Sequence, residues 1–281
     1  MRARSGLGAR RWRAFILRHG VLLAAAGITF SSSPLHAEPE KSETPQYGWQ
    51  EVWAGVDATR DVWLFYSGVT LAPWSKDIYS DGFRLRATGG YGKYKVEAGP
   101  THIECGNAGQ DQCASTKGGT VDVTLTYTDA LIGYQQRFSE LTAKAFVGAT
   151  MIEHSVAKPE IGIKGMIELW LNLGNNAWTS LDLSYATAYD TAAARWRAGF
   201  RALPTLSIGP ELRYDHNNID YGGAETRKGL LDRHQRRGGV FARYEWFGGE
   251  ASIAAGLAET VQGGVSNNID PYATFNILFQ Y

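Results

Sequence analysis

Apolar and polar residues alternate one by one over long stretches of this chain, and this alternation constrains the fold more than any other feature. From Ile161 to Leu173, every second residue is Ile, Gly or Leu, and the residues between them include Lys164, Glu168 and Trp170. Successive side chains of a β-strand point to opposite faces, so one face of this stretch is apolar and the other is largely polar. The stretch therefore predicts a long strand with two different faces.

Similar stretches recur along the chain and predict an all-β protein of about twelve strands. They lie at roughly 49–59, 62–72, 83–92, 120–136, 141–154, 161–173, 178–189, 195–202, 205–216, 238–247, 250–260 and 271–281. A composition with 33 Gly, 14 Tyr, 11 Phe and 9 Trp also favours sheet over a Leu-rich helical core. The sequence lacks the run of about 18 apolar residues that a membrane-spanning helix requires, which excludes a helical membrane protein.

Short and long connections alternate between the predicted strands, as they do in outer-membrane barrels. The connections at 139–140, 174–176, 203–204 and 248–249 are tight, whereas those at 93–119, 217–237 and 261–270 are long and polar. The short link at 59–61 and the long one at 73–82 depart from this order. At the end of the sequence, Phe275, Ile277, Phe279 and Tyr281 share one face, which is typical of the closing strand of such barrels. We therefore expect an antiparallel transmembrane β-barrel of the outer-membrane type, with a soluble sandwich or lipocalin-like binder as the alternative.

The first 37 residues have the order of a secretory signal peptide: six arginines, the apolar run Val21–Phe30, and small residues before Ala37. We expect a flexible lead-in at 38–47, a single barrel domain at 48–281, and export to the outer membrane of a Gram-negative bacterium. The chain has 28 basic and 28 acidic residues, so removal of the six arginines leaves a charge of about −6. Cys105 and Cys113 lie in a polar, turn-rich stretch and predict a disulfide, with zinc binding as the competing interpretation.

Charged residues fall on the polar face of the predicted strands and are expected to line a hydrated lumen, because an arginine facing lipid near the midplane costs about 2–4 kcal/mol. They are Arg84, Arg86, Asp122, Lys144, Lys164, Glu168, Asp182, Arg195, Arg197, Arg201, Glu211, Arg213, Asp215, Arg243 and Glu245. This mixture of signs favours cross-strand ion pairs over a strongly selective pore. Trp170 with Arg195, Arg197 and Arg201 is the candidate path for a sugar ligand, since rings stack on sugars and charges bind hydroxyls.

The sequence gives little sign of an enzyme. His154 and Ser155 are neighbours, but adjacent residues of a strand face opposite sides and cannot form a catalytic pair on one surface. Serine-hydrolase, zinc-protease and phosphate-loop motifs are missing from the sequence. The basic cluster Arg227–Arg237 is interpreted as solvated loop, with contact to acidic surface polysaccharide as an alternative. We expect no catalytic residues, no metal, no cofactor and no nucleic-acid partner.

Three stretches carry a resemblance to a known family: Val52–Asp61, Tyr66–Pro73 and Asp81–Gly92. There the chain resembles the cellulose biosynthesis protein BcsS family. The resemblance implies a bacterial outer-membrane accessory of cellulose production, and it supplies no catalytic residues to transfer. The hypothesis is therefore a non-enzymatic barrel that assists secretion or surface retention of cellulose or another exopolysaccharide, with outer-membrane lipid, the polysaccharide and other cellulose-synthesis components as partners. A small general porin and a lipid-modifying outer-membrane enzyme are the alternatives.

Overall fold

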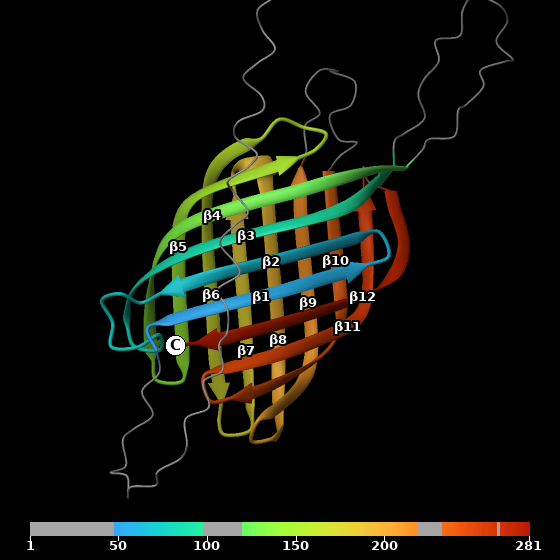
Figure 1. The fold of residues 1–281 in the computed structure, drawn as a ribbon. Coiled ribbons are helices and arrows are strands. Elements are labelled where there is room, and N and C mark those ends of the chain that lie inside the picture. The colour runs from blue at the N-terminus through green and yellow to red at the C-terminus, as the bar shows by residue number, and fades with distance from the viewer. Residues whose placement is uncertain (1–47, 98–119, 219–231, 263–264) are drawn as a thin grey trace, which may run out of the picture. The chain divides into compact units, whose positions relative to one another are not determined.

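The computed structural model describes residues 48–97, 120–218, 232–262 and 265–281 and contains twelve strands in one closed barrel (Figure 1). A short 3-10 helix, η1 (Ala188–Asp190), lies between β7 and β8. The strands are β1 (Gln50–Thr59), β2 (Val62–Leu71), β3 (Gly82–Glu97), β4 (Thr120–Phe138), β5 (Leu141–His154), β6 (Glu160–Leu173), β7 (Ala177–Ala186), β8 (Thr191–Leu203), β9 (Leu206–Asn218), β10 (Asp232–Trp246), β11 (Gly249–Gln262) and β12 (Val265–Gln280). The predicted fold class is confirmed.

Each strand pairs antiparallel with its neighbours in sequence, and β1 closes the barrel on β12. In the closing register Val52 lies opposite Phe279 and Val56 opposite Phe275. Each described strand therefore has a hydrogen-bonded neighbour on both sides, which is the condition for placing a sheet in lipid. Within the described ranges, no helix is long and apolar enough to cross a membrane.

The two ends of the barrel differ in their connections, and we name them the turn end and the loop end. The turn end carries the tight links β4–β5, β6–β7, β8–β9 and β10–β11 together with Gly48 and Tyr281. Ser139 and Gly174 adopt positive φ in two of these links, as tight hairpin turns require. At the loop end the strands run further than the sequence predicted, because β9 continues to Asn218 and β10 begins at Asp232. Residues 217–218 and 232–237 of the predicted loop 217–237 are therefore sheet.

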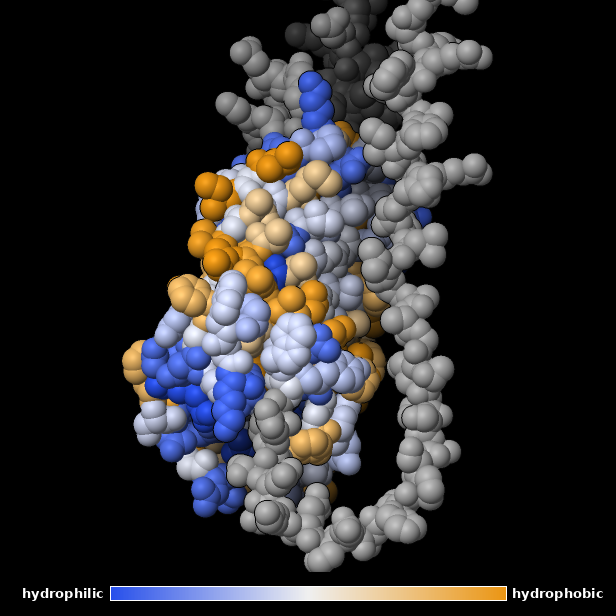
Figure 2. All heavy atoms as spheres, turned by 60° about the vertical axis from the view of Figure 1, so that its left-hand side comes forward, coloured by the Kyte–Doolittle hydropathy of each residue, from blue (hydrophilic) through white to orange (hydrophobic). Residues whose placement is uncertain are grey.

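Figure 2 shows hydrophobic side chains gathered between more hydrophilic regions on one face of the barrel, and exposed aromatic rings lie towards both ends. Exposed side chains of the middle zone include Ile132, Val147, Ile167, Leu212, Val240, Ile253 and Leu257. Exposed rings at the turn end are Trp49, Trp74, Phe83, Tyr134, Phe138, Tyr244 and Phe247, and those towards the loop end are Trp63, Tyr91, Tyr185 and Tyr214. Val240, for example, is 66% exposed. A continuous band of such exposed apolar side chains is favourable only in an apolar surrounding. An apolar belt flanked by aromatic girdles is the surface of a transmembrane barrel.

On the inner face, glycines make room for aromatic rings that lie on the neighbouring strand. The directly paired residues are Gly55 and Tyr66, Gly68 and Trp53, Gly90 and Tyr127, Gly133 and Phe146, and Gly199 and Trp178. A Cβ atom at Gly199 would lie 2.3 Å from Trp178 Cε2, and the other four glycines are covered as closely. The high content of glycine and aromatic residues thus has a structural role, because inward rings pack over inward glycines, whose backbone carries no side chain.

The segment 72–81, between β2 and β3, folds over the turn end and is held by Arg84. This guanidinium donates to Ile78 O at 3.0 Å, to Ser80 O and to Ser75 Oγ at 2.8 Å, and the residue is fully buried. The Asp77 carboxylate accepts hydrogen bonds from the Tyr79 and Ser80 amides and the Ser80 hydroxyl. Partial burial acts to raise the pKa of Asp77, but these hydrogen bonds outweigh it and lower the pKa. We call this segment the cap.

Candidate functional site

The inner face holds nearly all of the charges that the sequence assigned to it. Arg84, Arg86, Lys144, Lys164, Glu168, Asp182, Arg195, Arg197, Arg201, Glu211, Arg213, Asp215, Arg243 and Glu245 all share the inward phase of their strands. Asp122 is the exception, because it is exposed on the outward phase of β4, opposite Lys95. The polar-in rule fails there since Val123, Leu125 and Tyr127 occupy the inward positions near the loop end. Asp122 lies beyond the ring of Tyr91, where the outer face leaves the apolar belt.

Asp57 is the centre of an ion-pair network that crosses the lumen. It projects from β1, and its carboxylate accepts hydrogen bonds from Arg213 on β9 and from Arg237 on β10, the latter at 3.2 Å. Asp215 forms ion pairs with the same two arginines, with N–O distances of 3.1 and 3.2 Å, and its Oδ1 accepts a hydrogen bond from Arg213 Nε at 3.3 Å. Tyr66 adds its hydroxyl to Asp57 at 3.3 Å. Asp57 is 2% exposed, so this buried contact links β1 to β10 and β9, which lie three and four strands away around the barrel.

Further ion pairs brace the wall on either side of this network. Lys164 Nζ lies 2.6 Å from Asp129, and Arg195 Nη2 lies 2.5 Å from Glu211. Glu168 binds Arg86 and lies 3.8 Å from Lys144. The buried acids are therefore compensated by buried bases, which is the arrangement that makes charge tolerable inside a barrel.

A stack of rings and guanidinium groups lies inside the barrel towards the turn end. Trp170 and Trp178 stack with centroids 4.1 Å apart and an interplanar angle of 20°. Arg243, from β10 on the opposite wall, lies 4.7 Å from the Trp170 ring and 5.2 Å from the Trp178 ring. Arg197 lies 5.8 Å from Trp178 and 5.7 Å from Phe241. Trp178 has no exposed surface, and its Nε1 donates to Ser207 at 3.1 Å.

Each of the four residues of the predicted sugar path contacts other groups of the barrel. Trp170 stacks on Trp178, and Arg195 is paired with Glu211. Arg197 covers rings, and Arg201 donates to Asn175 O and to Asn172 near the turn end. A path for sugar along these side chains stays a prediction, and it would require their present contacts to break.

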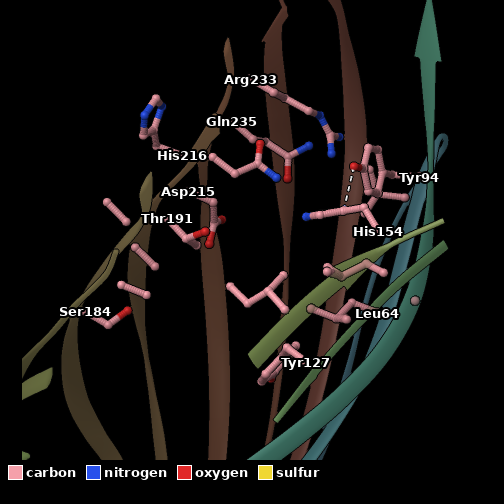
Figure 3. Close-up of a pocket in the computed structure, with 18 of the residues that line it drawn as sticks. Leu64, Tyr94, Tyr127, His154, Ser184, Thr191, Asp215, His216, Arg233 and Gln235 are labelled. Carbon is pink, nitrogen blue, oxygen red and sulfur yellow. Dashed lines mark hydrogen bonds between the residues drawn. The ribbon is translucent and has the colours of Figure 1, made fainter. Parts of the chain in front are cut away.

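At the loop end, above the Asp57 network, the lumen widens into a cavity of about 240 Å³. Figure 3 shows Arg233, Tyr94 and His154 together on one side of it, and Asp215 and His216 on the other. The Tyr94 hydroxyl lies 2.9 Å from His154 Nδ1, and the Arg233 guanidinium lies 4.8 Å from the Tyr94 ring centroid. Tyr94 and His154 are buried against Val123, Ile152 and Tyr189. We call this space the loop-end cavity.

Sequence reasoning missed four of the residues that matter here. It placed Arg233 and Arg237 in a solvated loop, but both lie on β10 with their side chains inward. The spacing of Arg233, Gln235 and Arg237 continues the phase of Arg243, which is the signal that could have revealed this. Asp57 and Asp129 lie inward in stretches whose neighbours are not uniformly apolar, so the alternation there was weak.

His154 and Ser155, the neighbouring pair of the sequence, lie in different surroundings. His154 points into the barrel, whereas Ser155 lies in the following turn and accepts a hydrogen bond from the Thr124 amide at 3.0 Å. No group of three His, Cys, Asp or Glu side chains in the described part of the chain is arranged to hold a metal ion. The predicted disulfide Cys105–Cys113 and the predicted signal peptide at 1–37 lie outside the described residues.

Comparisons with known proteins give one family and a set of barrels. The family model described as cellulose biosynthesis protein BcsS matches residues 52–267. The KdgM porin is 9% identical with a TM-score of 0.46, covering 82% of this chain and 99% of that one, and the NanC porin is 8% identical with a TM-score of 0.44, covering 83% and 100%. The transport unit of the autotransporter AIDA-I from Escherichia coli is 13% identical with a TM-score of 0.42, covering 86% and 93%. No protein with a curated description matches the sequence.

Proposed function

We propose, since this chain belongs to the cellulose biosynthesis protein BcsS family, that it assists the secretion or surface retention of cellulose from the outer membrane. In this proposal the barrel catalyses no reaction and does not conduct the glucan through its lumen. It acts instead as an anchored body whose loop end faces the cell exterior.

Placement in the outer membrane is supported by the surface of the barrel. Closed strand pairing satisfies the backbone, and the outer face presents an apolar belt with rings at both of its borders. The turn end, with its tight links and the cap, has the form of a periplasmic end, and the loop end has the form of an external one.

The observation that carries the non-conducting role is the pair of contacts that cross the lumen. Asp57 on β1 binds Arg213 on β9 and Arg237 on β10, and Arg243 covers the stacked Trp170 and Trp178. A glucan chain about one sugar across could pass only if both the Asp57 ion-pair network and the Trp170–Trp178 stack opened. Opening the ion-pair network would leave buried charges without partners, which costs several kcal/mol.

The role in cellulose production is tested by deleting the gene and measuring deposited cellulose alongside glucan synthesis in isolated inner membranes. We expect altered deposition, with the fraction of cellulose bound to cells changed, and normal synthesis in the isolated membranes. Reintroduction of the intact gene should restore deposition. Unchanged deposition in the deletion strain, or lost synthesis in the inner membranes, would contradict the proposal.

Recordings in planar bilayers separate this role from that of a general porin. The purified chain should produce almost no steady ion current, since the ion-pair network and the ring stack fill the lumen. The variant Trp178→Ala removes the most deeply buried ring and should raise the current, which shows that the barrel was inserted and that the stack was the obstruction. A steady current from the unmodified chain would favour the porin. A change in membrane lipids that His154→Ala abolishes would favour an enzyme.

A further inference from the structure

Arg233 is a partly buried cation that lines the loop-end cavity. Its side chain projects inward from β10, and its Nε atom is buried without a hydrogen-bond acceptor. Among the residues that the structure describes, no carboxylate forms a salt bridge with it. The face of Tyr94 lies 4.8 Å from its guanidinium carbon. A ring face stabilises a cation only modestly and accepts none of its N–H groups as a carboxylate would.

Most of the other charges that line the cavity form ion pairs, whereas Arg233 and the exposed Lys93 have no salt bridge among the described residues. Arg213 and Arg237 share Asp57 and Asp215, and Lys164 is paired with Asp129. These pairs form the floor of the cavity. A group that enters from the loop end therefore meets a net positive wall at Arg233.

The remaining lining has the character of a sugar site. Tyr94 and Tyr127 supply ring surface, and Gln235, His216 and Ser184 supply polar groups around the same space. A volume of about 240 Å³ lies just below the range of pockets for drug-sized ligands, about 300–1,000 Å³, so the cavity is sized for the end of a saccharide.

We propose that the loop-end cavity binds an acidic saccharide, with Arg233 holding its carboxylate. A guanidinium presents parallel N–H groups that match the two oxygens of a carboxylate, and the Tyr94 ring packs against the guanidinium of Arg233 at 4.8 Å. The carboxylate supplies the acceptor that the buried Nε lacks. Cellulose is neutral, so this ligand goes beyond the proposed function and does not depend on it.

The test is calorimetric titration of the purified full chain in detergent with glucuronate, with glucose as the neutral counterpart and inorganic phosphate as the bare anion. We expect glucuronate to bind at least about tenfold more tightly than glucose, the equivalent of one hydrogen-bonded charge. Arg233→Gln should lower glucuronate affinity about ten- to a hundredfold, and Arg233→Lys should give an intermediate loss because it keeps the charge but not the fork. Circular dichroism confirms that each variant is folded.

Arg236→Gln is the matched control, because Arg236 lies on the same strand but is exposed on the outer face. It removes the same charge and should leave glucuronate binding unchanged. Equal losses in Arg233→Gln and Arg236→Gln, or no glucuronate binding by the unmodified chain, would overturn the proposal. Equal binding of glucose would show that the charge is not recognised, and equal binding of phosphate would show an anion site without a sugar; either result would overturn it as well.

Discussion

Replacing Asp57 with asparagine tests whether the cross-lumen network is a dry, paired structure. The substitution keeps the size of the side chain and removes its charge. Arg213 and Arg237 then share only Asp215, and the new amide presents an NH₂ group that cannot accept their hydrogen bonds.

The expected cost follows from burial and from the number of lost contacts. Asp57 is 2% exposed and accepts from two guanidinium groups and the Tyr66 hydroxyl. Removing one partner of a buried ion pair costs about 3–5 kcal/mol, because the other charge is left uncompensated. We therefore expect Asp57→Asn to lower the free energy of unfolding by about 3–5 kcal/mol.

The assay is urea unfolding of the barrel in lipid vesicles, followed by tryptophan fluorescence and extrapolated linearly to water. Arg60→Gln is the control, because Arg60 pairs with Asp270 at 3.9 Å with a side chain that is 70% exposed. Such a surface pair contributes at most about 1 kcal/mol. If Asp57→Asn costs no more than Arg60→Gln, the network is hydrated and the lumen is not closed at this level.

Three further substitutions test other parts of the barrel. Gly199→Ala places a Cβ 2.3 Å from the ring of Trp178 and should destabilise the barrel by about 1–3 kcal/mol in urea unfolding, whereas Gly165→Ala, whose Cβ meets no atom within 4 Å, should not. Equal effects of the two substitutions would contradict the packing of rings on glycines. Val240→Arg on the outer belt should cost about 2–4 kcal/mol in vesicles, and Val240→Leu almost nothing, unless this face is not in lipid. Arg84→Gln removes the donors that hold the cap and should speed tryptic cleavage after Lys76 by about tenfold or more; an unchanged rate would mean that the cap is held by other contacts.

Local sequence pattern was sufficient for the strands and their faces. Alternation of Ile, Leu and Gly with Lys164, Glu168 and Trp170 determines which face of β6 is polar, whatever the rest of the chain does. Lipid imposes the polar-in, apolar-out pattern on every strand, because an Arg or Lys that faces lipid near the midplane destabilises the barrel by about 2–4 kcal/mol. The number of strands and the inward phase of almost every predicted lumen charge could therefore be predicted from the sequence.

Only the closed barrel decided which inward side chains meet. Asp57 and Arg213 lie 156 residues apart, and no local pattern connects them; closure and strand register bring their side chains into contact. The same geometry seats Trp178 on Gly199, turns Asp122 outward and leaves Arg233 without a carboxylate. The period of a strand is a property of its own backbone, whereas contacts across a lumen depend on how all of the strands tilt and close together.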